Sequence, residues 1–172
     1  SKEFIKEKNM QPEFVEDAIL EKYKTVAAAT VFSALKDRED FNCLLEDVYP
    51  MTPGKTVVGR ARTLRFLPDR PDLAEELAQK QGAEYEAMDL CSEGDVLVVD
   101  ARGNLDAGIF GDLYVARIGF RKSAGVVTDG CFRDAPYLRT VDFPCFASSV
   151  HGHAHATQHW AVDVNLPVSV SY

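Results

Sequence analysis

The sequence lacks any apolar run long enough to cross a bilayer, which takes about 20 consecutive apolar residues. Its first residues, SKEFIKEKNMQPEF, are charged and do not resemble a secretion signal. Basic residues are also scarce, because 19 lysines and arginines stand against 27 aspartates and glutamates, for a formal net charge of −8. Nucleic acids and anionic membranes are bound by clustered basic side chains. We therefore expect a cytoplasmic protein that binds neither nucleic acid nor membrane.

Closely spaced cysteines are missing as well. Cys43, Cys91, Cys131 and Cys145 lie far apart, and none belongs to the C-x-x-C spacing of a zinc or redox motif. Without a paired framework, disulfides are not expected. We interpret the four residues as reduced thiols that pack in the core of an intracellular protein.

The sequence does contain enough apolar residues for one core, because 46% of its 172 residues are hydrophobic. We therefore expect a single domain over residues 1–172. Apolar residues recur at helical spacing over residues 13–36, which predicts one amphipathic N-terminal helix. Residues 56–66 have the composition of a strand, and a charged second helix is expected over residues 71–88. The continuous apolar run Val96–Val99 predicts a strand covered on both faces.

A strand–helix–strand unit is completed by the next two segments. Residues 112–122 have the pattern of a helix with an acid in its first turn, and residues 125–129 that of a strand. The two strands of such a unit are parallel. Three shorter elements are predicted after it: a helix at residues 135–138, a strand at 143–147 and a half-buried strand at 161–170. Pro167 places this last strand at a sheet edge or a bulge. The fold class is α/β with a mixed or largely parallel sheet.

Residues that could carry chemistry follow the two best strands, because ligands bind beyond the carboxyl ends of parallel strands. One loop delivers Gly111-Asp112 at a helix N-terminus, and the turn after the next strand delivers Arg133-Asp134. A helix N-terminus binds carboxylates, arginine forks onto them, and paired acids hold a hard divalent cation. The alternative is that these residues form a helix cap or a surface ion pair. Asp100 and Asp129 are interpreted as turn formers.

These residues together resemble a known family. Asp112, twenty intervening residues and Arg133-Asp134 are similar to the D-x20-R-D-x2-E/D pattern of RraA-like aldolases, and VVTDGCFRD is similar to their strand-to-active-site turn. PGKTVVGRARTLRF, EGDVLVVDARG and VDFPCFAS are similar to family segments in the same order, so the resemblance covers residues 15–170. It implies a swivelling β/β/α-type fold with an N-terminal helix, assembled as a homotrimer with active sites between subunits.

The resemblance also implies an activity and roles for the site residues. Such a protein is a lyase that uses a divalent metal, Mg²⁺ or Mn²⁺, to cleave or decarboxylate small 2-oxo acids of the 4-hydroxy-2-oxoglutarate or oxaloacetate type. Asp134 would bind the metal directly, Asp112 would bind it through water, and Arg133 would stabilise the enolate formed as the C–C bond breaks. The carried-over substrate contacts are Gly111, Leu113, Tyr114 and Arg133.

Departures from the family pattern keep other interpretations open. Tyr137 stands where the pattern has an acid, which removes one group beside the metal. Family chains continue beyond residues 161–170 into a Gly-rich turn and further strands, so we expect those strands to be missing unless a separate C-terminal polypeptide supplies them. The family also includes ribonuclease regulators that act by protein contact, and this chain is alternatively such a non-catalytic binding protein. A second alternative is a lyase for sugar-derived 2-oxo acids.

All four histidines fall in the segment VHGHAHATQHW. In an extended segment His151, His153 and His155 share one face, an arrangement that chelates zinc or copper. We predict instead that the segment, which ends near His159, is no structural zinc site, because such sites draw ligands from separated segments and no cysteine is nearby. It is interpreted as a loop at the site or at a trimer contact, with acid–base chemistry by one histidine as a second functional interpretation.

Overall fold

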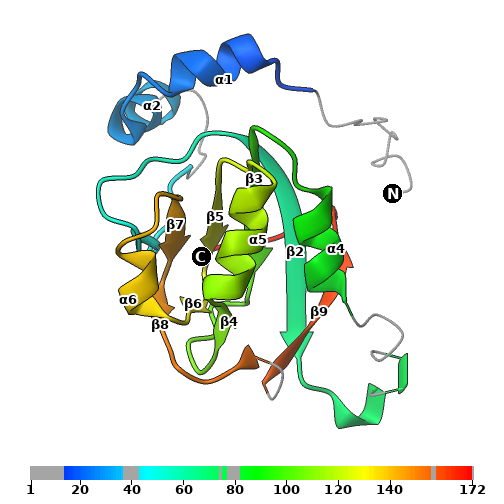
Figure 1. Ribbon diagram of the computed structural model, residues 1–172. Coiled ribbons are helices and arrows are strands. Elements are labelled where there is room, and N and C mark those ends of the chain that lie inside the picture. The colour runs from blue at the N-terminus through cyan, green and yellow to red at the C-terminus, as the bar shows by residue number, and fades with distance from the viewer. Residues whose placement is uncertain (1–13, 37–42, 74, 77–81, 156–157, 172) are drawn as a thin grey trace, which may run out of the picture.

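The computed structural model describes residues 14–36, 43–73, 75–76, 82–155 and 158–171 (Figure 1). In chain order the elements are α1 (Asp17–Tyr23), α2 (Ala28–Leu35), β1 (Tyr49–Pro50), β2 (Arg60–Pro68), the short 3-10 helix η1 (Pro71–Leu73), α4 (Ala83–Leu90), β3 (Asp95–Asp100), β4 (Gly108–Phe110), α5 (Asp112–Phe120), β5 (Gly125–Thr128), β6 (Cys131–Phe132), α6 (Ala135–Leu138), β7 (Cys145–Ala147), β8 (Ser149–Val150) and β9 (His159–Val164). None of the helices in these ranges is long and apolar enough to cross a membrane.

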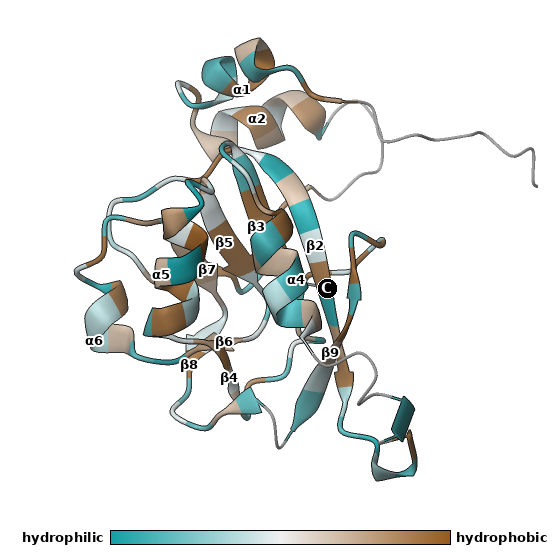
Figure 2. Cartoon of the chain, turned by 45° about the vertical axis from the view of Figure 1, so that its right-hand side comes forward, coloured by the Kyte–Doolittle hydropathy of each residue, from teal (hydrophilic) through white to brown (hydrophobic). Residues whose placement is uncertain are grey.

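A six-stranded sheet with the order β1-β7-β5-β3-β2-β9 forms the centre of the fold. Its four inner strands are parallel, and β1 and β9 run antiparallel at the two edges. Strand β3 is buried at all positions but Val98, as its continuous apolar sequence predicts. Figure 2 shows hydrophobic residues concentrated on β3 and β5. The predicted α/β class with a largely parallel sheet is confirmed.

The main core lies between this sheet and helices α4 and α5, which Figure 1 shows side by side in front of the strands. Leu97 and Val99 of β3 belong to one buried cluster with Met88 of α4 and with Val115 and Ile118 of α5. Burying such a side chain contributes about 1.5–3 kcal/mol to folding. The core therefore fixes α5, and with it the helix N-terminus predicted to bind a ligand.

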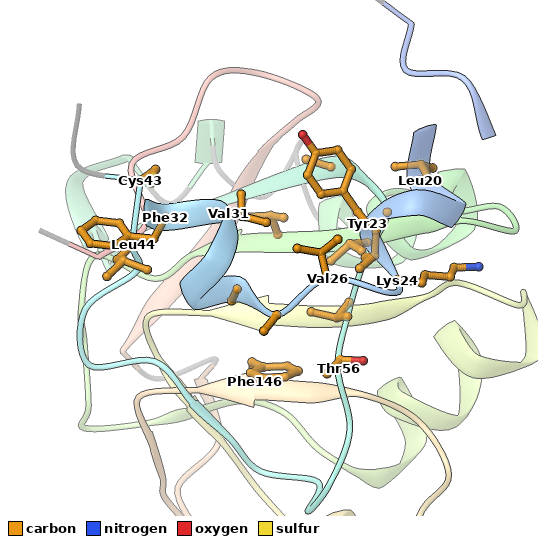
Figure 3. Close-up of a pocket in the computed structure, with 18 of the residues that line it drawn as sticks. Leu20, Tyr23, Lys24, Val26, Val31, Phe32, Cys43, Leu44, Thr56 and Phe146 are labelled. Carbon is orange, nitrogen blue, oxygen red and sulfur yellow. The ribbon is translucent and has the colours of Figure 1, made fainter. Parts of the chain in front are cut away.

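The opposite face of the sheet borders an apolar groove of about 710 Å³ beneath α1 and α2 (Figure 3). Side chains alternate between the two faces of a strand, so Val96 and Val98 line this groove whereas Leu97 and Val99 face the core. No residue of α2 is buried. The two N-terminal helices thus cover this face only loosely.

The prediction of a single N-terminal helix over residues 13–36 is wrong, because the described part of this segment forms two helices, α1 and α2. The hydroxyl of Thr25 donates to the carbonyl of Lys22 at 2.8 Å, a local bond that competes with the helical ladder. Ala27 then adopts an extended backbone before α2 begins. Periodicity alone did not reveal this break, because apolar residues continue through it.

Two further predicted elements differ in extent. Gly82 has a left-handed backbone at φ 96° and caps the N-terminus of α4, so the continuous helix predicted over residues 71–88 is interrupted there. Residues 74 and 77–81 of that prediction lie outside the described residues. The last strand ends at Val164 instead of continuing to residue 170, because Asn165 turns left-handed at φ 55°. Its predicted edge position is confirmed.

The cysteines and one of the two strand-end acids behave as predicted. All four cysteines are free; three are buried, and Cys43 is half-buried. Burial raises the pKa of Cys91 and Cys145 to about 11, which keeps them as unreactive thiols. Asp100 accepts the amide two residues further along the chain, as a turn former does. Asp129 instead accepts the amides of Ala101 and Gly103, in the turn after β3, at 2.7 and 2.9 Å, so it joins two loops and does not close its own turn.

Candidate functional site

A second, smaller sheet that the sequence did not reveal positions the candidate site. Strands β4, β6 and β8 are parallel neighbours, and each has only two or three residues. Strand β4 ends at Phe110 and β6 ends at Phe132, and the Arg133 amide donates to the Phe110 carbonyl at 2.7 Å. The sheet therefore brings Gly111-Asp112 and Arg133-Asp134 together, as the sequence predicts.

Asp134 is held against the N-terminus of α5. Its Oδ2 atom accepts the backbone N–H of Asp112 at 3.1 Å, and Asp112 Oδ1 accepts the N–H of Leu113 at 2.7 Å. Two carboxylates thus lie where the helix dipole is positive. Asp134 itself has a left-handed backbone at φ 52°, a conformation that costs about 1–3 kcal/mol in a residue other than glycine. Strain of this kind is concentrated at functional sites.

Gly111 leaves the space that the Asp134 carboxylate occupies. A Cβ atom at position 111 would overlap Asp134 Oδ2, and one at Gly108 would overlap the Arg133 side chain. Both glycines therefore permit the second sheet to place an acid and a guanidinium directly against β4 and its turn.

Gly111→Ala is expected to lower the free energy of unfolding by about 1–3 kcal/mol, because the new methyl group displaces Asp134 from the helix N-terminus. Gly119→Ala, within the same helix, is the matched control: its Cβ would lie 3.6 Å from the ring of Phe143, an ordinary contact. The control is expected to be neutral or stabilising by up to about 1 kcal/mol. Denaturant unfolding measures both, and equal values for the two variants would contradict the role of Gly111.

Arg133 borders a pocket of about 400 Å³ together with the two acids. The pocket is lined by Tyr85, Ile109, Gly111, Asp112, Leu113, Tyr114, Arg133, Asp134, Ala154 and His155. The Nε atom of Arg133 is buried and has no hydrogen-bond partner among the described residues. A buried donor without a partner costs free energy, and an anionic or carbonyl group of a ligand is one partner that would satisfy this N–H.

Tyr85 of α4 and Tyr114 of α5 form the aromatic wall of the pocket. Their hydroxyl groups lie 3.3 Å apart and their rings pack edge to face at 5.6 Å. Burial, followed by the hydrogen bond with Tyr85, raises the pKa of Tyr114, so its hydroxyl stays neutral near neutral pH. Sequence analysis missed Tyr85, because no local pattern shows that α4 packs beside α5.

The histidines divide into two pairs instead of sharing one face, which corrects the extended arrangement considered from the sequence. His151 and His153 are exposed, and the His153 amide donates to Nδ1 of His151 at 3.1 Å. His155 turns inward and lines the pocket, with its ring 6.3 Å from that of His159. Burial lowers the pKa of His155, outweighing the opposite effects of Glu84 and of a hydrogen bond to the backbone of Ile109.

The two acids at the site suit a magnesium ion, which keeps several water ligands, better than a metal ion that protein side chains surround completely. Among the described residues, no three His, Cys, Asp or Glu side chains converge as metal ligands. Asp112 and Asp134 supply two carboxylates, and Mg²⁺ commonly takes one or two carboxylates and completes its shell with water and substrate oxygens. Tyr137 lies on α6 and is absent from the residues that line the pocket.

The geometry defines an α/β protein with two carboxylates, an arginine and a helix N-terminus around one pocket. The profile of the RraA-like family, described as Aldolase/RraA, matches residues 28–171. The chain belongs to the RraA-like family.

Curated relatives carry aldolase names at modest identity. A putative 4-hydroxy-4-methyl-2-oxoglutarate aldolase from Halalkalibacterium halodurans is 29% identical over 147 residues, which are 86% of this chain and 63% of that protein. One of the same name from Alkalilimnicola ehrlichii is 39% identical over 77 residues, 44% of this chain and 47% of that protein. The chain thus spans less than two thirds of the length of these relatives.

Solved structures support the same fold. The crystal structure of Streptomyces coelicolor RraAS2, described as an unusual member of the RNase ES inhibitor RraA protein family, superposes with a TM-score of 0.78 at 28% identity, covering 92% of this chain and 76% of that one. The RNA-processing inhibitor RraA from Thermus thermophilis gives a TM-score of 0.55 at 24% identity, over 80% of this chain and 77% of that one. Relatives therefore carry both aldolase and inhibitor names.

Proposed function

We propose that this chain is a divalent-metal-dependent lyase that acts on a small 2-oxo acid. The observation that carries the proposal is the buried, unpartnered Nε of Arg133, which lines one pocket with the carboxylates of Asp112 and Asp134. A purely structural arginine would be expected to use its donors within the protein. The aldolase names of the curated relatives support this reaction class. The homotrimer stays a prediction.

The helix N-terminus of α5 is the proposed binding site for the substrate carboxylate. Amides in the first turn of a helix have no partner within the helix and attract anions. The Leu113 amide donates to the Asp112 carboxylate in this structure. Substrate binding at that amide would therefore displace the Asp112 side chain, which becomes free to hold a water molecule near Asp134. Tyr114 contributes the next amide of the same turn.

In the proposed cleavage of a 4-hydroxy-2-oxo acid, the bond between C3 and C4 breaks. Its electron pair stays on the C3 side as an enolate, the C4 hydroxyl loses its proton to water and becomes a carbonyl, and the enolate takes up a proton to give pyruvate. A divalent ion held by Asp134, and by Asp112 through water, would supply Lewis-acid withdrawal of charge from the keto oxygen. Arg133 stabilises the enolate oxygen through its planar, permanently charged guanidinium.

Decarboxylation of oxaloacetate tests the proposal, because it passes through the same pyruvate enolate and needs no knowledge of the natural substrate. With Mg²⁺ or Mn²⁺ the protein is expected to accelerate pyruvate formation well above the rate with the metal alone, and a chelator is expected to abolish the difference. Pyruvate release is followed in a coupled assay. A rate no higher than that of the metal alone, with either ion, would contradict the lyase and favour a non-catalytic protein-binding member of the family.

A further inference from the structure

A second pocket of about 280 Å³ adjoins the candidate site. It lies between α4 and β9, which pack against each other, and is lined by Gly82, Glu84, Tyr85, His155, His159, Trp160 and Ala161. Tyr85 and His155 line both this pocket and the one that contains Arg133. These two side chains are common to both linings, so the two pockets adjoin each other at Tyr85 and His155.

His159 is the residue of this second pocket that most needs a ligand. Its side chain is fully buried at 0% exposure, and neither Nδ1 nor Nε2 has a hydrogen-bond partner among the described residues. The ring packs on Phe66 at 5.0 Å between centroids, so an apolar neighbour covers it on one side. A buried imidazole with two unsatisfied nitrogens is costly, and a phenyl ring at the same place would avoid that cost.

The charge around the second pocket selects against a second anionic group. Glu84 is the only carboxylic acid in its lining, and no lysine or arginine is among the lining residues. Burial lowers the pKa of both histidines, to about 4 for His159, so that both rings are neutral at neutral pH. A neutral imidazole offers one donor and one acceptor, which match an alcohol hydroxyl.

We infer that the pocket of His155 and His159 is a subsite for the uncharged, hydroxylated tail of the substrate, and that His159 hydrogen-bonds a tail hydroxyl. This inference rests on the proposed function, and it names the substrate class: sugar-derived 2-oxo acids with a polyol tail. A second carboxylate, as in 4-hydroxy-2-oxoglutarate, would meet Glu84 in this lining, whereas the positive charge of Arg102 acts on His159 from outside the lining. The Arg133 pocket binds the 2-oxo acid end that all of these compounds share.

The test compares three substrates on the metal-loaded protein: oxaloacetate, 4-hydroxy-2-oxoglutarate and a 2-oxo-3-deoxyhexonate, which has a hydroxylated tail. Of the two 4-hydroxy acids, the hexonate is expected to give the higher kcat/KM with the wild type. His159→Phe is expected to lower kcat/KM for the hexonate roughly 10- to 100-fold, the effect of losing a hydrogen bond to a buried ligand hydroxyl. Oxaloacetate decarboxylation, which needs no tail contact, is expected to change less than about 2-fold.

Two variants serve as controls. His153→Phe makes the same substitution on the exposed part of the histidine segment and is expected to leave all three rates unchanged. His159→Gln keeps a donor and an acceptor and is expected to retain more hexonate turnover than His159→Phe. If the phenylalanine variant does not fold, the glutamine variant decides, and its substrate selectivity must shift away from the hexonate.

The outcomes separate the subsite from the reaction itself. Preference of the wild type for 4-hydroxy-2-oxoglutarate, or an equal loss for all three substrates in both His159 variants, would overturn the subsite while the lyase stands. Absence of oxaloacetate turnover in the wild type would overturn the proposed function and the subsite with it. A selective loss for the hexonate supports both.

Discussion

Asp134→Asn is expected to abolish both metal dependence and turnover while the protein keeps its fold. The amide retains an oxygen that accepts the Asp112 N–H now bound at 3.1 Å, so the helix N-terminus stays capped. It loses the negative charge that a divalent cation requires of its ligand. Calorimetric titration with Mg²⁺, circular dichroism and the oxaloacetate assay measure the three properties on one sample. Undiminished turnover that still requires magnesium would sink the assignment of Asp134.

Arg133→Lys is the companion variant, and it separates charge from geometry. Lysine keeps the positive charge but loses the planar fork, so magnesium binding is expected to persist while turnover falls by about 100-fold or more. If the pair were only a helix cap or ion pair, both variants would lower stability by about 1 kcal/mol and leave activity nearly unchanged. The two variants therefore distinguish a metal ligand, an enolate-stabilising group and a structural pair.

Acid is expected to destabilise the fold through His159, by up to roughly 3 kcal/mol between neutral pH and pH about 4. The pKa of His159 is lowered from 6.5 to about 4, first by burial and then by the nearby charges of His155 and Arg102. Between these two pH values the unfolded chain binds a proton that the folded protein excludes. The contribution of His159 to the free energy of unfolding is therefore fully present above pH 6.5 and is lost as the pH falls toward 4.

The matched variant isolates this contribution. His159→Phe cannot titrate, so its free energy of unfolding is expected to fall less between pH 7 and pH 4 than that of the wild type, as measured with urea. His155 also has a lowered pKa and acts in the same direction in both proteins. Asp129 has a pKa raised by burial and acts in the opposite direction, again in both. An identical pH dependence of the two unfolding free energies would contradict the buried, neutral state of His159.

The elements that the sequence predicted well are those whose pattern depends on immediate neighbours. Strand β3 was recognised from its continuous apolar run, α6 from residues 135–138, and α5 from apolar spacing with Asp112 in its first turn. The Arg133-Asp134 pair was found because it follows a buried strand, and parallel strands direct their carboxyl ends to one edge. The hydrogen bond from the Asp112 amide to the Asp134 carboxylate shows that the two segments meet.

Other features depend on contacts, local or between distant segments, that apolar periodicity does not show. The break between α1 and α2 rests on a hydroxyl of Thr25 that competes with helical bonding, against a periodicity that continues through it. The second sheet consists of strands of two or three residues, too short to show an alternating pattern. Its members are recognisable only from their partners, and the same holds for Tyr85, which reaches the pocket because α4 packs on α5.

The sequence by itself determined the α/β class, the family resemblance and the two dipeptides of the candidate site, because apolar periodicity and residue spacing are properties of the chain alone. Only the tertiary structure decided that Arg133 carries a buried donor without a partner and that His159 lies buried while His151 is exposed. Burial and hydrogen-bond satisfaction depend on what packs around a side chain. Four histidines that lie within nine residues of the sequence therefore differ in burial and hydrogen bonding because the fold placed different segments beside them.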